Sequence, residues 1–126
     1  MSTLIISNLS DGTKTVATSY VTAGSTKAYS EQDNTVVTIN QSLNQSSITD
    51  SATGHKIHNW TSAFANNTYL ILIGAAGNRG TGTSTTRGVQ PDAAWTTTAA
   101  DVRYAYATNN ANDDTQAGVA VVGDLA

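Results

Sequence analysis

The sequence of 126 residues contains no cysteine and a single proline, and only 12% of its residues are charged. The absence of cysteine excludes disulfide bonds, thiolate nucleophiles and cysteine-ligated zinc. It leaves the redox compartment open, because such a chain tolerates oxidising and reducing media alike. Low proline and a net charge of −3 differ from the composition of a disordered chain. The length suits one core, so residues 1–126 are predicted to form a single domain.

Basic residues are also scarce. The six lysines and arginines stand singly along the chain, so no cluster could neutralise a run of phosphates, and we expect no nucleic-acid partner. The longest apolar run, Tyr69–Ala76, is far too short to cross a bilayer as a helix, and we expect no membrane insertion. Residues Met1–Ile6 lack the basic start of a signal peptide.

Small neutral polar side chains take the place of charge. The chain has 21 Thr, 12 Ser, 11 Asn and 5 Gln residues. Thr, Ser and Asn are weak helix formers, and the residues typical of helix bundles are few. Short β-branched stretches separated by turn residues are typical of antiparallel β structure. The sequence therefore predicts an all-β fold without helices, an antiparallel β-sandwich of about 6–8 short strands.

Seven stretches carry a strand pattern. The run Tyr69–Ala76 is apolar without alternation, which predicts a central strand buried on both faces. Replacement of Ile71 or Leu72 by Asp is then expected to prevent folding, since burial of such a side chain contributes about 1.5–3 kcal/mol. The last strand is predicted to form a hairpin with the one before it. The predicted strands are Thr3–Ser7, Thr35–Asn40, Ser47–Thr49, His55–Trp60, Tyr69–Ala76, Asp101–Thr108 and Gly118–Gly123.

Both histidines of the chain lie in the predicted strand His55–Trp60. Alternation places Lys56, His58 and Trp60 on one face. Neither face is cleanly apolar, which predicts an edge strand with exposed histidines. His55 and His58 are three positions apart and point to opposite faces, so one metal ion cannot bind both.

Other ligand and catalytic motifs are incomplete. Asn110, Asn112 and Asp114 alternate like the first ligands of a calcium loop, but Val121 stands where that loop needs its last carboxylate. The glycines after the apolar run do not follow the dinucleotide-binding spacing, and no helix start follows them. No motif places a nucleophile beside a base. We therefore expect no metal, no cofactor, no catalytic residue and no enzymatic activity.

Residues 77–100 contain one bulky aliphatic residue, Val89, among many Thr, Gly and Ala. Structureless segments of this length are uncommon in compact domains unless they are functional, so the stretch either hides a strand or forms a long presented loop. We predict the loop. Its Arg79, Arg87 and Trp95 belong to types enriched at binding hot spots and are the candidate contacts to a partner or receptor. The alternative is a plain surface loop with Trp95 packed into the core.

Short motifs occur in a fixed order along the chain: Asn8–Thr13, Gly24–Tyr29, Ser46–Asp50, Gly54 and Gly123–Ala126. In these motifs the chain resembles a β-rich, tail-fibre-like module of virion structural proteins from marine tailed bacteriophages. The resemblance covers residues 8 to about 76 and the C-terminal residues. It departs from the family pattern at Tyr29, where tryptophan is usual, and after Gly54, where His55 replaces aspartate.

The resemblance implies a place on the virion exterior, assembly as a homotrimer and contacts with other virion proteins of the capsid or tail. It implies no catalytic residues. We therefore predict a non-enzymatic bacteriophage structural protein that decorates the capsid surface as a knob or head fibre. The alternative is a tail-fibre tip or receptor-binding module that contacts host cell-surface glycans. A third alternative, a carbohydrate-active enzyme, would need paired carboxylates across a groove. Residues 1–7 are predicted to serve as an attachment segment or an edge strand.

Overall fold

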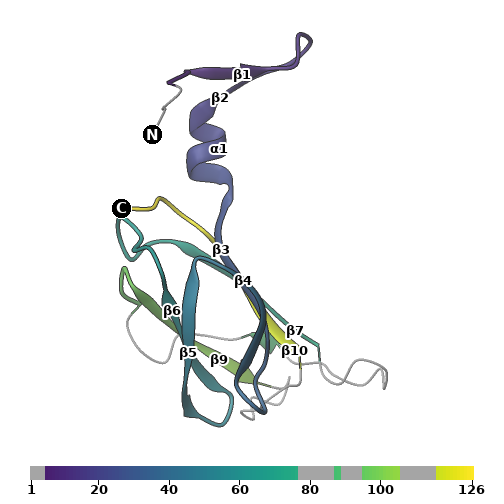
Figure 1. The fold of residues 1–126 in the computed structure, drawn as a ribbon, viewed down its shortest axis with the longest axis vertical. Helices are drawn as coiled ribbons and strands as arrows, with labels where there is room; N and C mark the ends of the chain where they lie inside the picture. Colours follow the sequence, from purple (N-terminus) through teal and green to yellow (C-terminus); the bar gives the residue numbers. More distant parts are fainter. Residues whose placement is uncertain (1–4, 77–86, 89–94, 106–115) are drawn as a thin grey trace.

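The protein is an antiparallel, all-β structure with one short helix among its described residues (Figure 1). The computed structural model describes residues 5–76, 87–88, 95–105 and 116–126. The all-β prediction is confirmed, but the expectation of no helix is wrong, because residues Thr18–Gly24 form one. The elements are β1 (Asn8–Ser10), β2 (Thr15–Ala17), α1 (Thr18–Gly24), β3 (Thr26–Asp33), β4 (Thr38–Leu43), β5 (Gln45–Ala52), β6 (His55–Trp60), β7 (Leu70–Ala76), β8 (Arg87–Gly88), β9 (Ala99–Ala105) and β10 (Gln116–Val122).

The strands form three sheets. A small sheet pairs β1 with β2, and two four-stranded sheets have the orders β4-β3-β10-β7 and β5-β6-β9-β8. Both larger sheets contribute to one hydrophobic core, which includes Val119 and Val121 of β10, Trp60 of β6, and Val102 and Tyr104 of β9. Burial alternates along β6 and β10, because successive strand residues point to opposite faces.

Residues 5–24, here called the arm, stand away from the two larger sheets (Figure 1). The hairpin β1-β2 turns at Asp11, whose carboxylate accepts the backbone N–H groups of Thr13 at 2.9 Å and Lys14 at 2.7 Å. The helix α1 follows without a side-chain cap and leads into β3. The predicted turn at residues 8–12 therefore begins too early, since Asn8–Ser10 is a strand. Residues 1–4, which include the start of the predicted first strand, lie outside the described residues.

The sequence does not predict two of the elements, α1 and β3. The helix has seven residues, Thr18–Gly24, and isolated helices of this length are unstable in water, so no local pattern identifies it. The strand β3 escapes prediction because two of its three buried positions are polar. Ala28, Ser30 and Gln32 point inward, which does not resemble the apolar alternation of an ordinary strand.

The apolar strand β7 lies at the edge of its sheet, and the prediction of a central, doubly buried strand is wrong. Among the described strands its hydrogen-bonded neighbour is β10. Leu70 and Leu72 are 59% and 56% exposed, whereas Ile71 and Ile73 pack against the core. Both faces of the strand are apolar, so the sequence shows no alternation although only one face is buried.

The strand β6 is interior, between β5 and β9, so the predicted edge position is wrong. The predicted alternation is correct, and Lys56, His58 and Trp60 all point into the interior. The expectation of exposed histidines fails for His58, which is fully buried. Burial of the lysine and the histidine is tolerated because both have hydrogen-bonding partners: the half-exposed carboxylate of Asp50 for Lys56, and buried side chains for His58.

Two further predictions are corrected by strand pairing. The strand expected from Thr35 begins at Thr38, because residues 34–37 form a turn in which Val37 has a φ of 54°. The last strand, β10, does not form a hairpin with β9. It pairs with β3 and β7, while β9 belongs to the other sheet. Tyr106, expected to continue the buried face of β9, lies outside the described residues.

Candidate functional site

The outward surface of the sheet β4-β3-β10-β7, here called the outer face, carries a continuous apolar row. Leu43 on β4 lies opposite Tyr29 on β3, and Tyr29 lies opposite Ala120 on β10. Ala120 in turn lies opposite Leu72 on β7. Leu43 and Leu72 are about half exposed, and Tyr29 is 39% exposed. Monomeric proteins seldom expose large contiguous apolar surfaces, and such surfaces commonly mark interaction sites.

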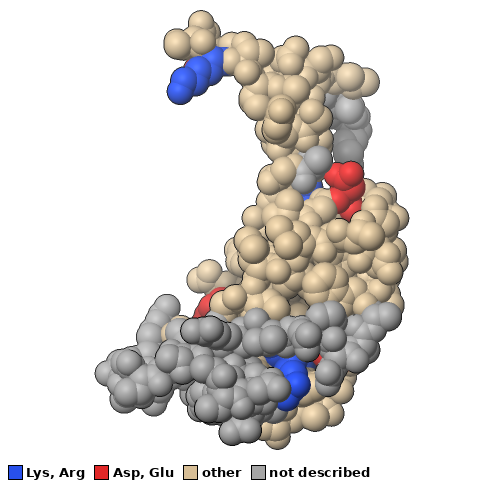
Figure 2. Space-filling view, turned by 180° about the vertical axis from the view of Figure 1, so that it is seen from behind, with Lys and Arg blue, Asp and Glu red and all other residues tan. Residues whose placement is uncertain are grey.

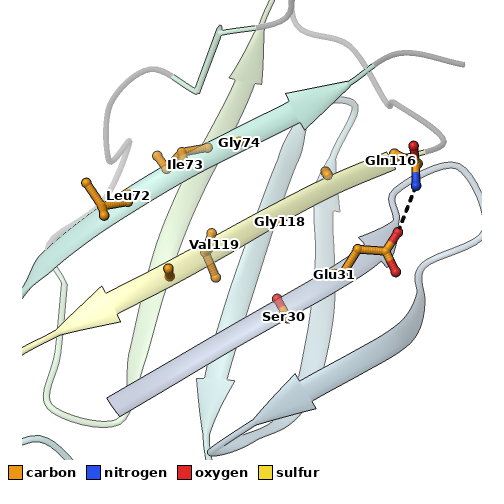
Figure 3. A pocket seen from close by; sticks show the side chains of 10 residues that line it. Ser30, Glu31, Leu72, Ile73, Gly74, Gln116, Gly118 and Val119 are labelled. Carbon is orange, nitrogen blue, oxygen red and sulfur yellow. Dashed lines mark hydrogen bonds between the residues drawn. The ribbon is translucent and has the colours of Figure 1, made fainter. Parts of the chain in front are cut away.

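A shallow groove crosses the outer face beside the apolar row (Figure 3). Gly74 on β7 is paired directly with Gly118 on β10, and the absence of side chains at both positions lowers the surface there. At one end Gln116 Nε2 donates to Glu31 Oε1 at 3.2 Å. The groove therefore joins an apolar floor to a carboxylate and an amide. Its lining residues are Ser30, Glu31, Leu72, Ile73, Gly74, Gln116, Ala117, Gly118, Val119 and Ala120.

The two paired glycines of the groove are expected to respond oppositely to alanine. A Cβ at Gly118 would lie 2.7 Å from the backbone oxygen of Ser30, so Gly118→Ala should lower the free energy of unfolding by about 1–3 kcal/mol. A Cβ at Gly74 meets no atom within 4 Å, so Gly74→Ala should be neutral or stabilising by about 0.5 kcal/mol. Urea unfolding of both variants measures the difference, and equal losses would contradict the close approach of Gly118 to the backbone of β3.

The arm is the second candidate surface. Leu9 and Val16 are paired across the hairpin, both are about 40% exposed, and Tyr20 on α1 is 73% exposed. Figure 2 shows a narrow waist between the arm and the rest of the molecule. A lone two-stranded hairpin is marginally stable in water, so a surface that covered the arm would stabilise it. Its large exposed apolar side chains are Ile5, Ile6, Leu9, Val16, Tyr20 and Val21.

A chain of buried polar side chains connects the two larger sheets. Gln32 Nε2 donates to the Tyr104 hydroxyl at 3.4 Å, and His58 Nε2 lies 3.1 Å from the same hydroxyl. His58 Nδ1 lies 3.2 Å from Gln45 Oε1, an oxygen that can only accept. In the neutral tautomer that donates from Nδ1 to this oxygen, Nε2 accepts from the Tyr104 hydroxyl. This order of donors and acceptors requires a neutral His58.

Burial sets the protonation of this chain. Desolvation lowers the pKa of His58 from 6.5 to about 3, because the charged imidazolium loses its hydration inside the fold. Desolvation also raises the pKa of the Tyr104 hydroxyl above its usual range. Both side chains are completely buried, so no substrate reaches them. The hydrogen bond between Gln32 and Tyr104 joins the two sheets, whereas those of His58 lie within the sheet β5-β6-β9-β8.

A buried cation, Lys56, lies on the same strand as His58. The side chain of Lys56 is 0% exposed, and its Nζ lies 2.7 Å from Asp50 Oδ1, whose side chain is 51% exposed. The exposed carboxylate keeps its contact with water while it neutralises the ammonium. This pair between β5 and β6 explains how a lysine occupies an inward position.

The structure describes the three predicted contact residues only in part, so it does not test whether they form one site. Arg79 lies outside them, and of Arg87 the structure describes the backbone, which pairs with Ala105. Trp95 stacks on Tyr69 with ring centroids 5.5 Å apart and planes inclined by 4°. Its indole N–H donates to the backbone oxygen of Asp101 at 3.1 Å. Trp95 thus packs at the border of the core, as in the alternative considered for it.

The segment 77–100 is not one uninterrupted loop. It includes β8 and the first residues of β9, two strands that pair antiparallel with each other. The two stretches 77–86 and 89–94 lie outside the described residues. The prediction of a presented loop thus does not hold for residues 87–88 and 99–100, where the sequence lacks the bulky β-branched residues that usually identify a strand.

Within the described ranges, no three His, Asp or Glu side chains gather as metal ligands would. The calcium-like positions Asn110, Asn112 and Asp114 lie outside those ranges. No described helix is long and apolar enough to span a membrane.

Sequence reasoning does not identify the outer face or the arm as functional surfaces. The one signal for them is in β7, whose apolar residues occupy both faces and thus include more than a core requires. The other members of the row, Tyr29 and Leu43, come from strands whose pairing no local pattern reveals. Comparison with family models, curated proteins and solved structures finds no match to this chain.

Proposed function

We propose that the chain is a non-enzymatic structural protein of a bacteriophage virion, exposed on the particle as a capsid decoration of knob or head-fibre type. The observation that carries the proposal is the projecting arm, residues 5–24, with its exposed apolar side chains. An arm left uncovered by its own body suits attachment to other polypeptides. The ordered motifs that resemble virion modules support the same function.

We propose further that the body is an antiparallel β-sandwich. Two four-stranded sheets share one core, and the hydrogen bond between Gln32 and Tyr104 joins a strand of each sheet. Inward positions alternate with outward positions along β6 and β10, as in two sheets packed face to face.

We propose that the protein assembles as a homotrimer. The support is the exposed apolar row of the outer face, together with the apolar edge strand β7. An apolar edge strand invites uncontrolled pairing unless another element covers it. Assembly with identical copies would cover such surfaces in a defined way.

A tail-fibre tip that binds host cell-surface glycans is the second candidate function. It is favoured by the groove, where Glu31 and Gln116 stand beside the apolar floor at Gly74 and Gly118. Sugars present hydroxyl groups at their edges and C–H groups on their faces, so such a groove matches both. The two candidates differ in where the chain sits on the particle.

Labelling of intact particles tests the proposed function. An antibody against the chain, visualised by electron microscopy, should bind the head surface, and the chain should copurify with separated heads. Label at the tail end would replace the first proposal by the second. Absence of the chain from purified particles would contradict both.

Adsorption to host cells tests the second function through the predicted contacts. If the chain is a receptor-binding tip, the double variant Arg79→Ala/Arg87→Ala should adsorb more weakly while still entering particles. If the chain is a decoration, adsorption should be unchanged. Trp95 is left in place, because its removal would take away the stacking partner of Tyr69.

A further inference from the structure

We infer that the arm of one copy packs on the outer face of a second copy, so that three arm-to-face contacts close the trimer. This inference rests on the proposed homotrimer and names its interface. Arm and outer face are different patches of one chain, so their contact is head-to-tail. Head-to-tail contacts form a closed ring when the rotation between copies is a third of a turn.

The two patches match in apolar character. Both are apolar and exposed: six side chains on the arm, from Ile5 to Val21, and four on the outer face. The outer-face members are Tyr29, Leu43, Leu70 and Leu72. From their exposed fractions, the ten side chains present on the order of 800 Å² of apolar surface. One arm-to-face contact would bury this area in total, about half of a standard interface, and each copy of the ring would bury it once through its own arm and its own outer face.

The arm is held away from the outer face of its own chain. The backbone oxygen of Val21, in the last turn of α1, accepts the Ser25 hydroxyl at 2.6 Å and the Lys27 ammonium at 3.1 Å. These bonds cross the junction between α1 and β3, and a cation at a helix C-terminus is favourable. They fix the arm as an extension of β3 (Figure 1). In this orientation the arm can contact the outer face of another copy but not that of its own chain.

Two variants of the full chain test the contact from both sides. The arm variant Leu9→Gln/Tyr20→Gln and the face variant Leu70→Gln/Leu72→Gln change exposed residues, so each should keep its circular dichroism spectrum and cooperative unfolding. The wild-type chain should sediment as a trimer, and each variant as a monomer. Variants that remain trimeric would overturn the inference and leave the trimer itself standing.

Mixing the two variants distinguishes arm-to-face contacts from contacts between like patches. The face variant keeps a normal arm, and the arm variant keeps a normal outer face, so the mixture should form a one-to-one complex. If arms instead met arms, or faces met faces, every contact between the two variants would include one altered patch, and no mixed complex would form. A mixture that stays monomeric would overturn the inference.

The absence of cysteine in the natural chain makes cross-linking a direct test. Single variants Tyr20→Cys and Leu72→Cys, mixed with a short bismaleimide, should give a covalent dimer of the two different chains. The control pair Tyr20→Cys and Ser51→Cys, with Ser51 exposed on β5 of the other sheet, should give little. A double variant Tyr20→Cys/Leu72→Cys that cross-links only within one chain would overturn the inference.

A monomeric wild-type chain at micromolar concentration would remove both the trimer and this interface. The place of the chain on the particle would still be decided by antibody labelling. The failure of the interface and the failure of the virion function are therefore separate results.

Discussion

Acid is expected to destabilise the protein through His58, by about 3 kcal/mol between pH 7 and pH 4.5. The pKa of His58 is about 3 in the folded protein, against 6.5 for an unburied histidine. Above pH 6.5 the imidazole is neutral in both states. Below pH 6.5 the histidine binds a proton in the unfolded chain but stays neutral in the folded chain. The free energy of unfolding therefore falls by about 1.4 kcal/mol for each pH unit. The loss continues until the pH approaches 3.

The hydrogen bonds of His58 give the physical reason for this loss. A protonated His58 would donate from Nε2 toward the Tyr104 hydroxyl, which donates to Nε2 in the neutral tautomer described above. The Tyr104 hydroxyl would then have to reverse its own bond inside a buried region. Protonation therefore disrupts hydrogen bonds within the sheet β5-β6-β9-β8, at the tyrosine whose hydroxyl also accepts the Gln32 bond between the two sheets.

Urea unfolding at several pH values measures the effect and its origin. The variant His58→Gln should be less stable at pH 7 but should lose much less stability on acidification. The matched control His55→Gln, at a partly exposed position of the same strand, should keep the full acid dependence. If His58→Gln shows the same pH slope as the wild-type protein, the buried neutral histidine is not the cause.

Neighbouring residues of β7 are expected to differ sharply in their tolerance of charge. Ile71→Asp should lower the free energy of unfolding by about 3 kcal/mol or more, because a side chain packed on the core is lost and a carboxylate is desolvated. Leu72→Asp should leave the fold intact, since Leu72 is 56% exposed. The sequence alone predicts failure of folding for both.

Circular dichroism and urea unfolding of dilute protein compare these two variants. Leu72→Asp should unfold near the wild-type midpoint while it loses the proposed trimer contact. The variant Leu72→Asn is the control for the charge itself. Equal destabilisation by Ile71→Asp and Leu72→Asp would indicate that β7 is buried on both faces, and would contradict its position at the edge of the sheet.

Local properties of the sequence determine the fold class and the alternation within strands. β-branched and small polar residues favour strands over helices wherever they occur. A period of two places Lys56, His58 and Trp60 on one face without knowledge of any other segment. For the same reason the buried positions of β9, Val102 and Tyr104, follow from sequence.

The tertiary structure decides which face is inside, which strands are neighbours and which polar groups are buried. Tyr104 bonds to His58, 46 positions earlier, and to Gln32, 72 positions earlier, and no local pattern contains such pairs. A strand with two apolar faces, such as β7, becomes an edge or a centre only through its pairing with β10. The arm and the outer face likewise depend on tertiary pairing. β3 follows α1 directly and lies between β4 and β10, so its pairing places the arm beside this sheet and brings together the strands of the outer face. Pairing is decided by the free energy of the whole packed core, and this is why the class could be predicted and the surfaces could not.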